Sequence, residues 1–156
     1  MELNNWVKIY REAYSTIGLN SVIPFNGLNE VLELLTEKGI IIIIISNKGE
    51  KAIHDTLKKF NLHEFVDLII EEKPGIAKKP SPDVYEKVIK EKYPHVDPSK
   101  VIMVGDTVAD IEFANNVGMD SCWAAYGYGN KEDCKSLKPT IIVNNLLEIL
   151  SDVSGK

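Results

Sequence analysis

The sequence is poor in the features that mark several large classes of protein. Its two cysteines, Cys122 and Cys134, do not have the spacing of a metal site or of a disulfide framework. Its longest apolar run, from Ile40 to Ile45, is far too short to span a bilayer. The polar N-terminus lacks the basic start and apolar stretch of a signal peptide. We therefore expect a cytoplasmic protein with reduced thiols and without a membrane partner.

The sequence also lacks a surplus of basic residues. Its 18 lysines and arginines stand against 23 acidic residues, which gives a net charge of −5 at pH 7. No cluster of basic residues offsets this charge, so the electrostatic footprint of a nucleic-acid-binding protein is missing. A hydrophobic content of 44% over 156 residues is ordinary for one globular domain with a real core. We expect no nucleic-acid partner.

Apolar runs and helical apolar spacing alternate along the chain. The uninterrupted runs Ile40–Ile45 and Val101–Val104 are typical of strands buried on both faces, and hence of a parallel sheet. We expect strands over 40–45, 65–70, 101–104, 121–125 and 140–143. We expect helices over 6–17 and after Asn26 or Asn29, Gly49, Pro82, Asp106 and the capping residue Asn144. This alternation predicts a doubly wound α/β fold.

Two carboxylates follow the strand predicted at Val101–Val104. Gly105 permits a tight turn, Asp106 stands just past the carboxyl end of the strand, and Asp110 lies in the next helix. Open α/β sheets bind ligands outside the carboxyl ends of their strands. Two carboxylates at that place suit Mg²⁺, which prefers oxygen ligands and often bridges to phosphate. The alternative is that Asp106 caps the helix and Asp110 is a solvated acid of its first turn.

Two further polar clusters fall at positions where such a fold holds ligands. Ser46 and Asn47 follow the isoleucine run at the start of a predicted helix, where a phosphate can bind. Taken alone they would be read as a plain helix cap, and only their coincidence with the other clusters favours the phosphate site. Lys79 stands before Pro80 and Pro82, which stiffen its loop, so it can place a charge on a phosphate. The alternative for Lys79 is a solvated surface lysine.

The order of these clusters resembles motifs II, III and IV of the haloacid dehalogenase-like (HAD) hydrolase superfamily. The three motifs are Ser46-Asn47, Lys79-Pro80-x-Pro82 and Val104-Gly105-Asp106-x-x-x-Asp110. The likeness is greatest to the bacterial phosphoglycolate phosphatases. It implies a Rossmann-like HAD core over residues 23–156, with α/β/α layers around a mostly parallel sheet, and a remnant of a helical cap and linker over residues 1–22.

The resemblance also implies roles for these residues. Ser46 and Asn47 would hydrogen-bond the transferring phosphoryl group, and Lys79 would neutralise it and orient the nucleophile. Asp106 would bind Mg²⁺, and Asp110 would either bind it or order its waters and Lys79. The expected activity is a Mg²⁺-dependent phosphatase acting on a small phosphorylated metabolite such as 2-phosphoglycolate.

The family's motif I is missing from this sequence. That motif is an Asp-x-Asp at the end of the central first strand, whose first aspartate forms an aspartyl phosphate and whose second is the general acid and base. Here the first aspartate is Asp55, and no two aspartates are separated by one residue. The central strand and the nucleophile are therefore absent from the chain. We expect a second copy in a homo-oligomer, or a missing N-terminal segment, to fill the sheet, because unpaired apolar strand edges attract partners.

Three other functions remain open from the sequence. The missing nucleophile favours a catalytically inactive remnant that binds phosphate or a partner. A phosphoglucomutase-like HAD relative is the alternative among enzymes. A receiver-type signalling domain also combines aspartates, a hydroxyl and a lysine, but in the opposite chain order, since here Ser46 and Lys79 precede Asp106.

Overall fold

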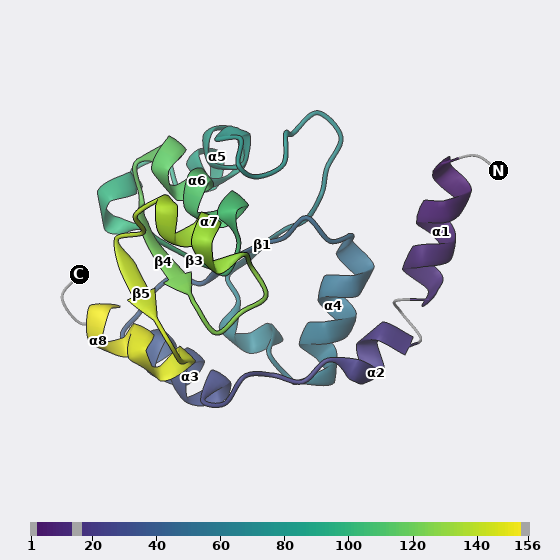
Figure 1. Ribbon diagram of the computed structural model, residues 1–156, viewed down its shortest axis with the longest axis horizontal. Helices are drawn as coiled ribbons and strands as arrows, with labels where there is room; N and C mark the ends of the chain where they lie inside the picture. Colours follow the sequence, from purple (N-terminus) through teal and green to yellow (C-terminus); the bar gives the residue numbers. More distant parts are fainter. Residues whose placement is uncertain (1–2, 14–16, 154–156) are drawn as a thin grey trace. The chain divides into compact units, whose positions relative to one another are not determined.

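A computed structural model describes residues 3–13 and 17–153 of the chain (Figure 1). Its helices are α1 (Leu3–Ala13), α2 (Leu19–Ser21), α3 (Leu28–Glu37), α4 (Glu50–Lys59), α5 (Lys90–Lys92), α6 (Val108–Val117), α7 (Lys131–Ser136) and α8 (Ile149–Val153). Its strands are β1 (Ile43–Ile45), β2 (Leu68–Ile70), β3 (Ile102–Gly105), β4 (Asp120–Ala124) and β5 (Ile141–Val143). The chain divides into two compact units, Met1–Phe25 with Leu32–Lys73 and Asn26–Val31 with Pro74–Lys156. The predicted boundary between residues 22 and 23 stays a prediction.

The first unit is built around a two-stranded parallel sheet. β1 pairs with β2 over the whole length of both strands, from Ile43 opposite Leu68 to Ile45 opposite Ile70. The crossover between them contains α4, whose Ile53 and Leu57 are buried. A parallel pair joined through a helix is the expected unit of an α/β fold.

The isoleucine run forms a shorter and less buried strand than its composition predicts. Only Ile43–Ile45 is β-strand, these side chains are partly buried, and Ile41 is 54% exposed. The Ile42 amide donates to the Asp67 carboxylate at 2.8 Å, so a side chain replaces the next strand residue as its partner. The predicted strand over 65–70 is likewise reduced to Leu68–Ile70, because residues His63–Phe65 form a 3₁₀ turn. The prediction of six strand residues buried on both faces was wrong in extent.

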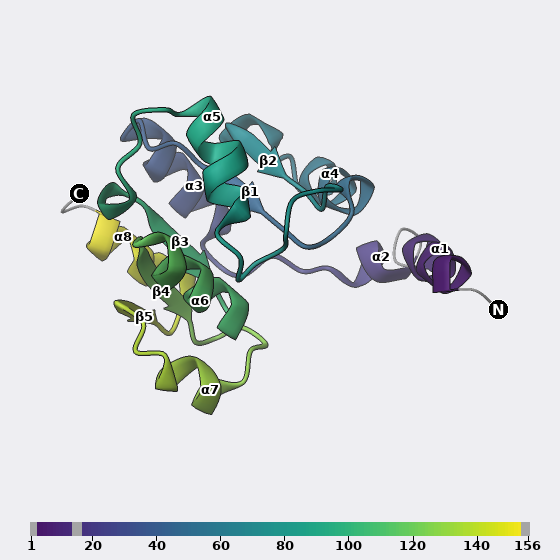
Figure 2. The same cartoon turned by 90° about the horizontal axis from the view of Figure 1, so that it is seen from above.

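The second unit holds a three-stranded parallel sheet in the order β3-β4-β5 (Figure 2). The pleat of β4 directs neighbouring side chains to opposite faces. Trp123 packs with Ile111 of α6 and Cys134 of α7, whereas Cys122 packs with Val143 and Ile149. Helices therefore cover both faces of this sheet, which gives the unit the α/β/α layering expected from the sequence.

Helix α6 follows β3 as predicted and leads into β4. Its buried residues Ile111, Phe113 and Ala114 anchor it in the core of the second unit. It ends at Gly118, which adopts the left-handed conformation with φ 84° and donates its amide to the Ala114 carbonyl at 2.9 Å. The predicted end of the helix at this glycine is confirmed.

Other local predictions fit less closely. The helix expected at Pro82 is wound as π-helical turns over Tyr85–Ile89 before α5. The side chain of Asn145, rather than Asn144, caps the last helical segment by accepting from the Glu148 amide. The helix expected over 6–17 is seen over Leu3–Ala13, and residues 14–16 lie outside the described chain. In the described part, no helix combines the length and the apolar character that a membrane crossing requires.

We expect Gly118→Ala to lower the free energy of unfolding by about 1 kcal/mol, because an alanine at positive φ is strained. Urea denaturation followed by circular dichroism measures the change. Asn115→Ala, an exposed position of the same helix, is the matched control and should cost nothing, since alanine has the higher helix propensity. Equal stability of Gly118→Ala and the wild type would contradict the capping role.

Candidate functional site

Asp106 is held at the carboxyl end of β3 by the loop that follows the neighbouring strand. Its Oδ2 accepts a hydrogen bond from the backbone amide of Tyr128 at 2.8 Å. β3 and β4 are parallel neighbours, so the segments after both strands emerge at the same edge of the sheet. Asp106 does not cap α6, because the residue at that position is Thr107. The helix-cap alternative for Asp106 is thus excluded.

Asp110 is tied to the turn at which α6 begins. Its Oδ2 accepts from the Thr107 hydroxyl at 2.7 Å and from the Thr107 amide at 3.0 Å. A Cβ on Gly105 would lie 2.3 Å from Cβ of Asp110, so only glycine leaves room for this arrangement. The side chain is buried rather than solvated, contrary to the alternative considered for it.

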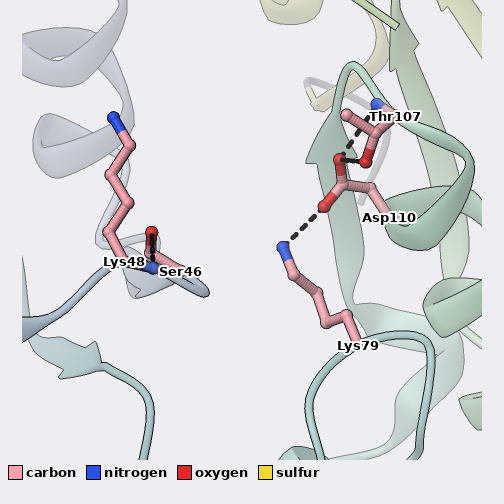
Figure 3. A network of polar contacts seen from close by, with 5 residues as sticks. All are labelled: Ser46, Lys48, Lys79, Thr107 and Asp110. Carbon is pink, nitrogen blue, oxygen red and sulfur yellow. Dashed lines mark hydrogen bonds and ion pairs between the residues drawn. The ribbon is translucent and has the colours of Figure 1, made fainter. Parts of the chain in front are cut away.

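The other oxygen of Asp110 pairs with Lys79 (Figure 3). Lys79 Nζ lies 2.5 Å from Asp110 Oδ1, and the two side chains are 8% and 10% exposed. The loop that carries the lysine is fastened to α6 a second time, because the Asn116 amide group donates to the Pro80 carbonyl at 2.9 Å. The peptide bond between Lys79 and Pro80 is cis. Lys79 is a held cation and not a solvated surface lysine.

The charge of Asp110 follows from these contacts. Burial raises the pKa of the carboxyl. The hydrogen bond and charge of Lys79, together with the two Thr107 donors, lower the pKa by more than burial raises it. The net shift places the pKa of Asp110 below its ordinary value. Asp110 is therefore ionised at neutral pH, with its Oδ1 against the amino group of Lys79.

The oxygens of this site differ in what they can offer a metal ion. The Tyr128 amide donates to Oδ2 of Asp106, and among the residues that the structure describes no hydrogen bond to its Oδ1 is seen. Both oxygens of Asp110 already accept from donors, which favours the second of its expected roles, the ordering of Lys79. Within residues 3–13 and 17–153, no three histidine, cysteine, aspartate or glutamate side chains gather into a metal cluster. Mg²⁺ is often held by one or two carboxylates plus substrate phosphate, so this donor set fits it through Asp106.

Ser46 and Asn47 lie in the first unit, directly after β1. The Ser46 amide continues the sheet by donating to the Ile70 carbonyl at 3.0 Å, and its Oγ accepts from the Lys48 amide at 3.1 Å (Figure 3). The N-cap residue of helix α4 is Gly49 and no side chain caps the helix, so neither Ser46 nor Asn47 serves as a cap. Their convergence with Lys79 and Asp106 stays a prediction, as does the filling of the sheet by a second copy or a further segment.

Three contributors to the site were given no role in it from the sequence. Thr107 stands three residues before Asp110, a spacing typical of a helix start, and this signal could have found it. Asn116 acts on the backbone of a loop 36 residues away, and Tyr128 contributes only its amide. Neither the Asn116 contact nor the Tyr128 contact can be predicted from the pattern of residue types.

Comparison with known proteins decides the family. The model of the haloacid dehalogenase-like hydrolases matches residues 1–124. The chain belongs to this family. The expected Rossmann-like HAD core with parallel strands is confirmed, and so is the likeness to the phosphoglycolate phosphatase branch.

Individual relatives agree with this assignment. A phosphoglycolate phosphatase of Aquifex aeolicus is 32% identical over 123 residues, which are 79% of this chain and 57% of the relative. A solved haloacid dehalogenase-like family hydrolase of Streptococcus pneumoniae is 26% identical with a TM-score of 0.83, over 96% of this chain and 69% of that one. A predicted phosphoglycolate phosphatase of Haemophilus somnus, 22% identical with a TM-score of 0.85 over 97% and 68%, shares the fold. The chain thus spans little more than half of the Aquifex relative.

We expect Lys79→Met to lower the free energy of unfolding by about 3 kcal/mol at pH 7, because it leaves Asp110 buried without its cation. The stabilising effect of the pair is present above the unfolded pKa of Asp, about 3.9, and is lost as pH falls through the lower folded value. Urea denaturation at pH 7 and near pH 3 should therefore show a large difference between variant and wild type that shrinks in acid.

Lys78→Met, at the exposed neighbouring lysine, is the matched control and should change stability by less than about 0.5 kcal/mol. An equal cost of the two substitutions, or a cost of Lys79→Met that does not depend on pH, would contradict the ion pair.

Proposed function

We propose that this chain supplies the phosphate- and magnesium-holding part of a HAD-family phosphatase acting on a small phosphomonoester such as 2-phosphoglycolate. The observation that carries the proposal is the buried ion pair between Lys79 and Asp110. Asp110 lies four residues after Asp106, whose Oδ2 accepts a hydrogen bond from a backbone amide. A buried lysine and a nearby carboxylate that is not part of its ion pair are two features that suit a metal-bound phosphate ester. The phosphoglycolate phosphatases among its relatives support the substrate class.

The residues of the site would act on the phosphoryl group mainly through their charges. Lys79 would meet the charge of the phosphoryl group, and Asp110 would hold the lysine in place. Asp106 would use Oδ1 to hold Mg²⁺, which supplies charge neutralisation on the transferring oxygens when bound. Ser46 and Asn47 would donate hydrogen bonds to the phosphoryl group from the end of β1. Phosphoryl transfer depends largely on such positioning and charge stabilisation.

Asp106→Asn is the direct test of the metal proposal. The asparagine oxygen can still accept from the Tyr128 amide, so the fold should survive while the charge that holds Mg²⁺ is lost. Isothermal titration with MgCl₂ in the presence of inorganic phosphate should show binding to the wild type and at least tenfold weaker binding to the variant. Glu132→Gln removes an exposed carboxylate from α7 and is the control for net charge. Equal affinity of wild type and Asp106→Asn would contradict the proposal.

These 156 residues alone should hydrolyse phosphate esters negligibly, because the family's aspartyl nucleophile is not among them. Release of nitrophenol from p-nitrophenyl phosphate with MgCl₂ measures the rate. Turnover of about 1 s⁻¹ or faster that Asp106→Asn abolishes would show that the chain uses another nucleophile.

The second candidate is a phosphate-binding protein without catalysis, and the absent Asp-x-Asp favours it. The two candidates differ in what supplies the central strand. Coding DNA in frame before Met1 that contains an Asp-x-Asp would favour the phosphatase. Its absence, together with phosphate binding by the purified chain, would favour the binding protein.

A further inference from the structure

The loop after β4, residues 126–129, approaches Asp106 more closely than any side chain would permit. A Cβ on Gly127 would lie 2.2 Å from Cβ and 2.5 Å from Oδ2 of Asp106. A Cβ on Gly129 would lie 1.9 Å from the Asp106 carbonyl oxygen. Neither glycine has the positive φ that would itself call for glycine, so the reason for both is the space that they leave.

The residue between the two glycines contributes through its backbone. The Tyr128 amide donates to Oδ2 of Asp106, while its side chain is 94% exposed. Gly39, Gly75 and Gly118 differ from the two loop glycines, because all three have positive φ and nothing within 4 Å of a built Cβ. The crowding at Gly127 and Gly129 is thus not a general property of the glycines of this chain, and at both positions the neighbour is Asp106.

We infer that Gly127 and Gly129 are positioning residues for Asp106. The loop packs against the Asp106 side chain and the Tyr128 amide donates to Oδ2, so the carboxylate is held in one orientation. Such preorganisation removes the cost of ordering the carboxylate when the ligand binds. The inference rests on the proposed function for the identity of the ligand, but the packing itself does not.

The first experiment measures metal affinity with Mn²⁺ as the probe, using the electron paramagnetic resonance signal of the free ion. Gly127→Ala should weaken Mn²⁺ binding at least tenfold, because the new methyl group displaces the Asp106 carboxylate. Gly118→Ala is the matched control: it strains α6 and lowers stability, yet it should leave Mn²⁺ affinity unchanged. Equal losses in the two variants would overturn the inference, since general destabilisation would then explain both.

The second experiment tests the packing without a ligand and remains decisive if the wild type binds no metal. Thermal unfolding is followed for Gly127→Ala, for Asp106→Gly and for the double variant. Removal of the Asp106 side chain removes the atoms that the alanine would strike, so the drop in Tm caused by Gly127→Ala should be at least twice as large in the wild-type background. Equal drops in both backgrounds would overturn the inference. A clear difference without Mn²⁺ binding would leave the positioning intact and count against the metal function.

Discussion

One carboxylate, that of Asp110, connects the segments that build the site in the second unit. It accepts two hydrogen bonds from Thr107 and one charged contact from Lys79, so it joins the start of α6 to a loop 31 residues earlier in the chain. A buried ion pair adds little net stability, yet loss of one partner is costly because the other charge remains buried. We interpret the role of this ion pair as positional, because the ionised aspartate keeps the lysine side chain in place.

Helix α6 connects the Asp110 contacts to the core of the second unit. Its buried face, with Ile111, Phe113 and Ala114, fixes it against β3 and β4. From its solvent side Asn116 holds the Pro80 carbonyl, and from its first turn Asp110 holds Lys79. The loop has little regular structure of its own and takes its position from a packed helix. Functional groups supported by rigid elements in this way are held more accurately than groups on free loops.

The sequence predicted well whatever depends on local chemistry. The order of strands and helices and the helix end at Gly118 follow from apolar spacing and glycine. It predicted poorly whatever depends on a distant partner. The strand of isoleucines is cut short because β2 offers only three residues to pair with, and Asp67 takes the next amide. The Tyr128 amide could not be foreseen at all, since every residue but proline has one.

The reactivity of the buried thiol of Cys134 can be used to measure local opening of the protein. Its Sγ lies 3.6 Å from the Asp106 carbonyl, it has no exposed surface, and burial followed by the charges of Asp106, Asp133 and Asp110 raises its pKa. A thiol reagent can reach this sulfur only when the packing around it, which includes Ile111 and Trp123, opens. The rate at which Cys134 is labelled therefore reports how often this region opens, once it is measured separately from the rate for the other buried thiol, Cys122.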